Sequence, residues 1–430
     1  MQAGRGRLHT RGGAARTAAM PALLRRPLPV ALLIAIAAQA LFLWRLTIPS
    51  TLMFDEIHYV PAARRLLALD GPANVEHPLF AKTLIAAGIA LFGDNALGWR
   101  LFSTLAATAV VTGVFALSWL ATRRLRPAVT GALCALFGFT VFVQARIAML
   151  DGYMAAFVVT GAACLLWAMH GTHAQVRRRW IAGAVLLGLA TGCKWTAAPY
   201  VAFAGVALIL LKRGRPDRWP GLAVLPALLL LGGVSVATYF ATFAPAFFYA
   251  QEPLTLTTIL PFQRYMYGQQ TQVLPPHAYQ SSWWSWPLDL RPIWYLYEPV
   301  DGAQRGVLMI GNPAVLWGGL VAVAVCGLAW LRTRDGRAGA AAMLWIAGFA
   351  IWAIIPKSLG FFYYYYLPSI WLCIAIAIAF DHWRARIAGW DEAYLVVVAG
   401  LFVHFHPILS AAALSGPRGF ARWMWFPTWP

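Results

Sequence analysis

Residues 27–59 read PLPVALLIAIAAQALFLWRLTIPSTLMFDEIHY, an apolar run that stops just before two adjacent carboxylates, Asp55 and Glu56. The run from Pro27 to Ile48 is long enough to cross a membrane, and no small-residue cleavage site follows it, so we predict a retained first span. Charged residues make up only 11% of the chain, and a charge beside a bilayer is costly. The same loop carries further ionisable residues, more than a simple connection needs: Arg64, Arg65, Glu76, His77, Lys82 and Arg100.

The composition is that of a polytopic membrane protein. Hydrophobic residues make up 60% of the 430 positions, whereas a soluble domain has roughly 45–50%. A net charge of +19 would suit a nucleic-acid partner, but the arginines lie mainly in short loops between apolar blocks, where they set topology. We therefore expect no nucleic-acid binding. The cysteines lie in or beside apolar blocks without metal-ligand spacing and predict neither a metal site nor disulfides: Cys134, Cys164, Cys193, Cys326 and Cys373.

Long apolar blocks predict about eleven transmembrane helices. The fifth and sixth are short, and only Lys194 and its neighbours separate them. One merged span would move the basic loops Lys212–Arg218 and Arg332–Arg337 to the opposite side, so the positive-inside rule favours two spans. The predicted spans lie near residues 28–48, 98–121, 127–145, 151–169, 180–193, 195–211, 220–243, 307–331, 338–356, 361–380 and 393–413.

This topology predicts an all-α, multi-pass protein of the plasma (inner) membrane, with the N-terminus cytoplasmic and the C-terminus outside. Residues 1–26 read as a disordered basic cytoplasmic tail, and residues 27–430 as one transmembrane domain. The outer side then holds the two longest connections, residues 49–97 and 244–306. Within the first, two helical patterns are too short to span, and we predict that they lie along the interface: Pro61–Leu69 and Pro78–Phe92.

Ionisable residues that the topology does not need lie at the outer ends of spans, where we expect them to converge on one cavity. They are Asp55, Glu56, Arg100, Arg146, Asp151, Lys194, His277, Arg291, Glu298 and Lys357. A transporter more often places such groups at mid-membrane, in the broken helices of repeats. Groups at span ends suit an enzyme whose substrate enters from the bilayer and whose acceptor arrives from outside.

Sugar transfer from a lipid phosphate needs both kinds of group. Cations stabilise the leaving phosphate, and arginine has a planar fork that matches phosphate oxygens. A hydroxyl nucleophile needs a base within hydrogen-bond reach. The residues alone leave structural alternatives open. Arg100, Arg146 and Lys194 read equally well as snorkelling interfacial side chains, and Asp151 as a cap of the fourth span.

An ordered set of motifs extends from about residue 50 to 380. The set comprises Phe54-Asp55-Glu56 with Tyr59 and Ala63-Arg64; Glu76-His77-Pro78-Leu79-Phe80-Ala81-Lys82; Phe92-Gly93-Asp94-Asn95 with Gly98-Trp99-Arg100; Arg146-Ile147-Ala148-Met149-Leu150-Asp151; Gly192-Cys193-Lys194-Trp195-Thr196; His277 and Ser281-Ser282-Trp283-Trp284-Ser285-Trp286-Pro287 with Arg291-Pro292; and Gly311-Asn312-Pro313.

This set resembles the protein O-mannosyltransferases, glycosyltransferases of the GT-C class that use dolichyl- or polyprenyl-phosphate mannose. Two features depart from the family pattern. Leu79 and Phe80 disturb the second Pro and the Gly of its His-Pro-Pro-Leu-Gly-Lys segment. The loop between the seventh and eighth spans is too short for the MIR domain of the eukaryotic enzymes, so the chain looks like a compact bacterial-type member whose acceptor recognition differs accordingly.

The resemblance implies a GT-C fold and a role for each candidate residue. Asp55 would be the base that takes the proton of a Ser or Thr hydroxyl, whose oxygen attacks sugar C1 with inversion. Glu56 would orient acceptor or sugar. The donor would be held at its phosphate by Arg100, Arg146 and Lys194 and positioned by Asp151. The acceptor groove would be lined by His77, His277, Trp283, Trp284 and Arg291.

The implied partners are a membrane lipid-linked sugar and a secreted or membrane protein. Asp55, Glu56 and Asp151 are candidate ligands for a divalent metal, but the nearby cations make one unnecessary, and we expect no metal and no other cofactor. Two alternatives stay open: a related GT-C enzyme that modifies a glycolipid or polysaccharide such as lipid A, and, in a different class, a transporter or flippase. The sequence predicts no oligomeric state.

Overall fold

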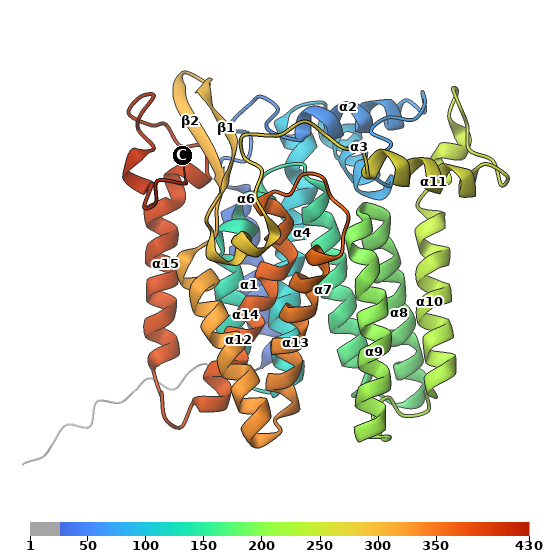
Figure 1. The fold of residues 1–430 in the computed structure, drawn as a ribbon, viewed down its shortest axis with the longest axis vertical. Helices are drawn as coiled ribbons and strands as arrows, with labels where there is room; N and C mark the ends of the chain where they lie inside the picture. Colours follow the sequence, from blue (N-terminus) through green and yellow to red (C-terminus); the bar gives the residue numbers. More distant parts are fainter. Residues whose placement is uncertain (1–25, 430) are drawn as a thin grey trace, which may run out of the picture.

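The computed structural model describes residues 26–429, in which a bundle of long helices carries a layer of shorter elements on one end (Figure 1). The bundle helices are α1 (Pro27–Leu43), α4 (Ala96–Thr122), α5 (Leu125–Leu136), α6 (Phe139–Ala145), α7 (Leu150–Ala168), α8 (His173–Cys193), α9 (Ala198–Gly214), α10 (Val224–Ala241), α12 (Pro313–Thr333), α13 (Gly336–Ala350), α14 (Tyr366–Trp383) and α15 (Trp390–Leu409).

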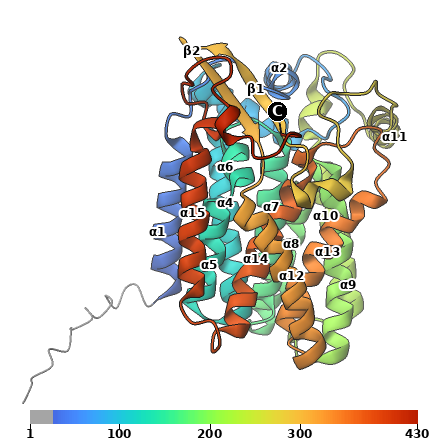
Figure 2. The ribbon, with the colours of Figure 1, turned by 60° about the vertical axis from the view of Figure 1, so that its left-hand side comes forward.

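The end layer holds three shorter helices and a β-hairpin, and two views show them on the same side of the bundle (Figures 1 and 2). The helices are α2 (Glu56–Leu67), α3 (Phe80–Phe92) and α11 (Ile259–Gln270), and the strands are β1 (Ile293–Val300) and β2 (Ala303–Met309). Short 3₁₀ turns are η2 (Trp195–Ala197), η3 (Ala244–Phe248), η4 (Trp283–Leu288), η5 (Ile351–Ala353), η6 (Phe362–Tyr365) and η7 (Ala421–Trp423).

Among residues 26–429, eight helices are long and apolar enough to cross a membrane, and α5 with α6, bent by 60°, would make a ninth span. Helix α1 has only 17 residues, and α8 begins with the basic run Arg177–Arg179, so both fall outside that criterion. Both nevertheless run alongside the spanning helices (Figures 1 and 2). A polytopic helical bundle is therefore confirmed, while the number of eleven spans stays a prediction.

The predicted break at Lys194 is confirmed. Helix α8 ends at Cys193 and α9 begins at Ala198. Lys194 between them has extended backbone, with φ −159° and ψ 134°. The two helices are thus separate segments.

The eighth span was predicted to begin near residue 307, and this is wrong. Residues 303–309 form β2, which pairs antiparallel with β1. Asp301 and Gly302 join the strands with positive φ angles of 50° and 73°, the geometry of a two-residue hairpin turn that favours Asp-Gly. Helix α12 begins only after Asn312, whose side chain accepts a hydrogen bond from the Ala314 N–H. The all-α prediction therefore misses this hairpin, although the dipeptide Asp-Gly is typical of such turns.

The outer-layer helices agree in part with the sequence. The predicted interfacial patterns appear as α2 and α3. Helix α11 was not predicted. It projects sideways beyond α10 (Figure 1), and Leu256 and Leu260 near its start are exposed.

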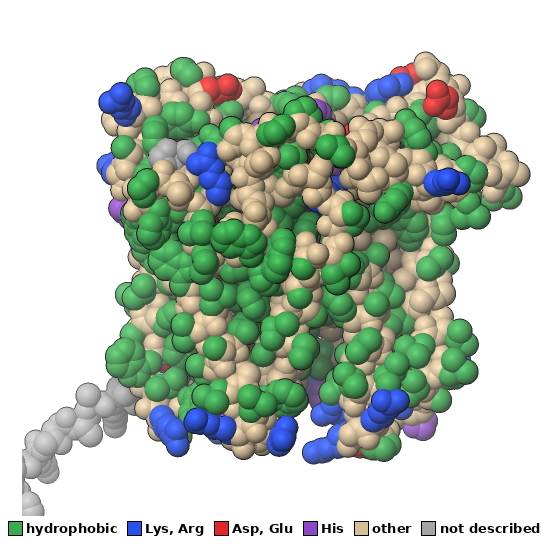
Figure 3. Space-filling model, viewed as in Figure 1, with side chains coloured by type: hydrophobic (Ala, Val, Ile, Leu, Met, Phe, Trp, Pro, Cys, Tyr) green, Lys and Arg blue, Asp and Glu red, His purple; other side chains and the backbone are tan. Residues whose placement is uncertain are grey.

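Basic side chains gather at the end of the bundle opposite to this layer, where the α9–α10 and α12–α13 pairs turn (Figure 3). The first described residues lie at that end, and the C-terminal segment lies at the other (Figures 1 and 2). Ends on opposite sides require an odd number of crossings. Which side faces the cytoplasm stays a prediction, and the predicted tail, residues 1–26, lies outside the described residues except for Arg26.

The core of the bundle lies around α14 and α7. Of the most apolar 18 residues of each span, 89% are buried in α14 with its leading turn and 67% in α7. In the spans that contain α9 and α10, only 22% are buried. Close packing near the core uses small residues: a Cβ on Gly183 of α8 would lie 2.6 Å from Leu165 of α7. The polar residues of the candidate site stand at the outer ends of these buried helices.

Candidate active site

Asp55 lies at the N-terminus of α2, in the layer above the bundle. Tyr59, one turn later, donates its hydroxyl to Asp55 Oδ2 at 3.2 Å. Phe54, just before it, has a φ of 49°, a region that bulky residues rarely adopt. The Phe54 ring stacks on Tyr295 of β1, with 4.4 Å between centroids. Strained backbone held by packing beside a carboxyl group is typical of functional sites.

Lys194 and Asp151 form a buried ion pair near Asp55. The Lys194 ammonium donates to both carboxylate oxygens of Asp151, at 2.9 and 2.8 Å, and both side chains are only 4% exposed. The rings of Tyr363 and Tyr364 lie 5.3 and 5.1 Å from the ammonium. The extended backbone at Lys194 lets its side chain leave the α8–α9 break and reach the first turn of α7.

The environment of Asp55 suits a general base. Desolvation by burial raises the pKa of its carboxyl above the ordinary value, while the positive charges of Lys194 and His58 oppose that rise and Asp151 adds to it. A base with a moderately raised pKa is a better proton acceptor near neutral pH than an ordinary carboxylate, and it remains ionised there if a cation stands close.

A second group of polar side chains joins three outer segments. The Gln270 amide nitrogen, at the end of α11, lies 3.0 Å from His77 Nδ1, and Lys357 donates to Gln270 Oε1 at 2.7 Å. Burial lowers the pKa of His77 well below its usual range, so this ring is neutral. Burial and the charge of Lys194 lower the pKa of Lys357 to about 8. The His77 ring also packs edge-on against Tyr59, with 6.0 Å between centroids.

Lys82 fixes the turn that carries His77. Its buried ammonium donates to the carbonyl oxygens of Ala73, Asn74 and His77, at 3.3, 2.7 and 2.8 Å. Burial lowers the pKa of Lys82 to about 7. The lysine five residues after the histidine of the His-Pro motif thus fixes the conformation of this turn by donating to three backbone carbonyl groups.

The predicted role of Glu56 in orienting acceptor or sugar does not fit its position. Glu56 and Arg100 are fully buried and pair with each other, at 2.8 and 2.7 Å. The Glu56 carboxylate also accepts from the N–H groups of Met53 and Ala148. Arg100 donates in addition to the carbonyls of Pro49 and Thr51. These contacts take four of the five N–H donors of Arg100, and its side chain is buried. In this structure the pair joins the first outer loop to α4, and a role of Arg100 at the donor phosphate stays a prediction.

Arg146 is likewise committed to the backbone. Its guanidinium donates to the carbonyl oxygens of Phe42, Trp44 and Arg45, at 3.0, 2.5 and 2.8 Å, and lies over the Phe142 ring. It satisfies carbonyls at the C-terminal end of α1 that the helix itself leaves unpaired. In this structure Arg146 thus joins the end of the first helix to α6, and its predicted contact with the donor phosphate stays a prediction.

The predicted acceptor candidates separate into two sets. Trp283, Trp284 and Arg291 line one groove of about 670 Å³, which also reaches Lys357 and Tyr364. His277 does not line it. The imidazole of His277 is exposed and packs edge-on against Phe361 at 5.3 Å. The groove therefore extends from the aromatic cluster of η4 to Lys357 and Tyr364, and the Tyr364 ring lies beside Lys194.

No group of three His, Cys, Asp or Glu residues close enough to hold a metal ion occurs among residues 26–429. Of the three carboxylates considered as ligands, Glu56 is occupied by Arg100 and Asp151 by Lys194. Two of the three carboxylates are thus already paired with a cation, and Asp55 accepts a hydrogen bond from Tyr59.

Some site residues were missed from the sequence. Tyr363 and Tyr364 belong to an uninterrupted aromatic run, Phe361–Tyr366, that follows Lys357 at the outer end of a span. That position beside a lysine is a signal that could have identified them. Gln270 had no such signal, because one glutamine in a polar loop looks like any other until α11 places it between His77 and Lys357.

Comparisons with known proteins identify the family of this chain. The family model for dolichyl-phosphate-mannose-protein mannosyltransferase matches residues 92–249, and that for the C-terminal four TMM region of protein-O-mannosyltransferase matches residues 255–429. The polyprenol-phosphate-mannose–protein mannosyltransferase of Mycolicibacterium smegmatis is 30% identical, with 88% of each chain covered. This chain belongs to the protein O-mannosyltransferase family. The family resemblance of the motifs is thereby confirmed.

Solved structures place this family member in the GT-C fold, as expected. The Saccharomyces cerevisiae protein O-mannosyltransferase Pmt1-Pmt2 complex bound to the sugar donor superimposes with a TM-score of 0.81 at 13% identity, over 94% of this chain and 92% of the other. ArnT from Cupriavidus metallidurans bound to undecaprenyl phosphate gives 0.55 at 19% identity, over 89% and 64%. Neither family match includes Asp55, so its role is argued from geometry.

Proposed function

We propose that this chain transfers mannose from a polyprenyl-phosphate mannose to a Ser or Thr hydroxyl of a protein, on the outer face of the plasma membrane and with inversion at C1. Membership of the protein O-mannosyltransferase family supports the reaction. The observation that carries the site is Asp55, a carboxyl with a raised pKa, within the electrostatic reach of the buried Lys194–Asp151 pair at the outer end of the bundle.

In the proposed step, Asp55 takes the proton of the acceptor hydroxyl as its oxygen bonds to sugar C1. The bond from C1 to the phosphate oxygen breaks, and its electron pair leaves with the polyprenyl phosphate. Tyr59 holds the Asp55 carboxyl through its hydroxyl hydrogen bond. Attack on the face opposite to the phosphate requires that the acceptor oxygen and the leaving phosphate oxygen lie on opposite sides of C1.

Lys194 and Lys357 are the cations that we assign to the leaving phosphate. Asp151 orients the Lys194 side chain through two hydrogen bonds and stabilises its positive charge. In this way Asp151 would help to position the donor, as predicted. Lys357 lines the groove beside Tyr364 and is half-buried. Cations in a site from which water is partly excluded stabilise developing negative charge more strongly than they would in water.

The polyprenyl chain has a matching apolar cavity of about 190 Å³ between α7, α9, α13 and α14. Tyr200 and Trp371 line it on the side of the lysines, and Leu166 and Met169 line it further along α7. A hydrocarbon chain would replace contacts that these walls otherwise make with lipid. We assign the acceptor to the groove of Trp283, Trp284 and Arg291, with His77 on the other side of Lys357 and His277 at its rim.

The same proposal includes the orientation and extent of the enzyme. The end with the outer layer faces away from the cytoplasm, because the short loops at the opposite end, such as Lys212–Arg218 and Arg332–Arg337, are rich in basic residues. Residues 27–430 act as one transmembrane catalytic domain, and residues 1–26 as a basic cytoplasmic tail. The acceptor is a secreted or membrane protein, and the reaction needs no divalent metal.

The test is transfer of labelled mannose from synthetic polyprenyl-phosphate mannose to protein in membranes that carry the chain. Asp55→Asn should lower turnover by about 10²–10⁴-fold, the usual contribution of a general base, with little change in donor binding. Asp70→Asn is the matched control, because Asp70 is an exposed acid of the same loop that pairs only with surface groups. Wild-type turnover by Asp55→Asn would remove Asp55 from the mechanism, and label in a glycolipid would show a different acceptor class.

A further inference from the structure

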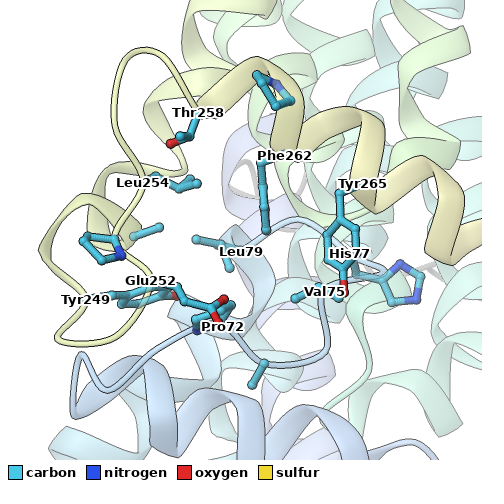
Figure 4. A pocket seen from close by; sticks show the side chains of 14 residues that line it. Pro72, Val75, His77, Leu79, Tyr249, Glu252, Leu254, Thr258, Phe262 and Tyr265 are labelled. Atoms are coloured by element: carbon cyan, nitrogen blue, oxygen red, sulfur yellow. The ribbon is translucent and has the colours of Figure 1, made fainter.

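A separate cavity lies in the outer layer (Figure 4). One of its lining residues, His77, also packs against Tyr59, the hydrogen-bond partner of Asp55. Its volume is about 320 Å³, at the small end of the range of ligand pockets, roughly 300–1,000 Å³. Side chains of the first outer loop face those of α11 and of the segment after α10 across it (Figure 4). The walls include Pro72, Leu79, Tyr249, Leu254, Phe262 and Tyr265.

The chemistry of this cavity excludes both parts of the lipid donor. None of the described residues that line it is Lys or Arg, so a phosphate would find no cation there. Apart from Ala246, at the end of the span that contains α10, its walls come from the outer layer (Figure 1). A polyprenyl chain belongs among the spanning helices, where the apolar cavity lined by Tyr200 and Trp371 lies.

A polypeptide that arrives from outside does fit. Walls of proline and aromatic side chains bind apolar or proline-containing segments in extended conformation. We infer that this cavity is a subsite for an apolar side chain of the acceptor polypeptide, a few residues away from the Ser or Thr that receives the sugar. The inference rests on the proposed function, because it concerns the acceptor of that reaction.

Continuity with the catalytic centre gives the spacing. His77 lines the cavity and packs against Tyr59, whose hydroxyl donates to Asp55. Two side chains in a row span roughly 10 Å, a distance that about three residues of extended chain cover at ~3.3 Å each. The subsite should therefore select the residue about three positions from the modified hydroxyl.

The chain offers a matched pair of variants. Tyr265 and Tyr267 lie on the same helix, α11, and are 53% and 54% exposed, but only Tyr265 lines the cavity. Because both are half-exposed, Tyr265→Ala and Tyr267→Ala should fold alike. The acceptors are synthetic Gly-rich peptides with one Thr, in which one Leu or Pro is moved through the positions within about four residues of the Thr.

For the wild-type enzyme we expect a lower acceptor KM when the apolar residue stands at one particular spacing. Tyr265→Ala should raise the KM of that peptide about tenfold, as loss of a central aromatic contact does, and should leave the Gly-only peptide unchanged. Tyr267→Ala should behave as the wild type, and the donor KM should be equal in all three proteins.

Two results would overturn the subsite. One is a wild-type KM that does not depend on where the apolar residue stands. The other is a raised donor KM in Tyr265→Ala, which would place the lipid in this cavity. Failure of the proposed function looks different, since the wild-type enzyme would then transfer mannose to none of the peptides.

Discussion

Two buried ion pairs lie at the outer end of the bundle, and they differ in what surrounds them. Glu56 and Arg100 are fully buried, and their remaining hydrogen bonds go to backbone groups. Lys194 and Asp151 bond to each other but face the rings of Tyr363 and Tyr364, and their charges act on Asp55. The first pair therefore has the contacts of a structural ion pair. The second has the position of a charge that can interact with a substrate.

The difference shows how to separate structural from functional cations. A buried guanidinium that already bonds to carbonyls and a carboxylate has few donors left for a phosphate, however close it lies to the site. An ammonium beside an aromatic-lined cavity can exchange part of its contact with one carboxylate for contact with a ligand. From composition and topology, Arg100 and Lys194 were equally good candidates for binding the phosphate. They differ in how many of their N–H donors already bond within the protein.

The sharpest way to break this comparison is to remove a member of each pair. Arg100→Met leaves Glu56 buried without its cation, which should cost about 3–5 kcal/mol of stability. We expect a strong loss of folded protein, measured by the midpoint of thermal unfolding in detergent. The molecules that do fold should keep the donor KM of the wild type. A stable Arg100→Met protein with a greatly raised donor KM would return Arg100 to the phosphate site.

Lys194→Met should lower activity as well as stability, because this pair is also buried. Loss of one preorganised charge from a site of this kind lowers kcat by about 10²–10³-fold, whereas the aromatic neighbours can still pack against the methionine. Because Asp151 would then be buried without its cation, the double variant with Asp151→Asn is the control for stability. A double variant that folds normally and has wild-type kcat would show that the pair serves only the fold.

Sequence reasoning reached the bundle because its signals are long and repetitive. Apolar blocks and basic loops placed the helices, and the extended residue Lys194 lay where topology required a break. It failed where three-dimensional partners decide. The second strand of the hairpin, within residues 293–309, looked like the start of a span because β2 is mostly buried. The dipeptide Asp301-Gly302, which favours a hairpin turn, was nevertheless visible in the sequence.

The candidate site follows the same rule. Asp55 and Lys194 stood out as charges that the topology did not need, and the structure keeps them together. Arg100 and Arg146 stood out for the same reason, but their carbonyl partners come from residues 42–51, which no local pattern connects to them. Only the fold could show that these arginines are already used.

The comparison can be sharpened with pH. The pKa of Asp55 is raised by burial and held down by the positive charge of Lys194. The base must be ionised, so kcat/KM should rise with pH on the acid side, with a midpoint above that of an ordinary carboxyl group. Lys194→Met removes the lowering influence and should move this limb to higher pH. Asp151→Asn removes a raising influence from the same carboxyl group.

The check is a pH–rate profile of kcat/KM for each variant, with Asp70→Asn as control. Equal acid limbs in the wild type and both variants would show that neither member of the pair acts on the base.

The smallest expected effect concerns Lys357. Burial and Lys194 lower its pKa to about 8, so the ammonium loses its proton as pH rises through that value, and attraction for the donor phosphate falls with it. We expect the donor KM of the wild type to increase above about pH 8. Lys357→Gln should raise the donor KM about tenfold at neutral pH, the effect of roughly 1.4 kcal/mol, and abolish its alkaline rise.

Gln270→Leu separates this electrostatic effect from positioning, because it removes the side-chain acceptor of Lys357 and leaves the charge and the longer bond to the Gln270 carbonyl in place. The alkaline rise should persist in Gln270→Leu, with a donor KM between those of the wild type and Lys357→Gln. If Lys357→Gln kept both the wild-type donor KM and its alkaline rise, the leaving phosphate would depend on Lys194 alone, and the groove beside Tyr364 would belong entirely to the acceptor.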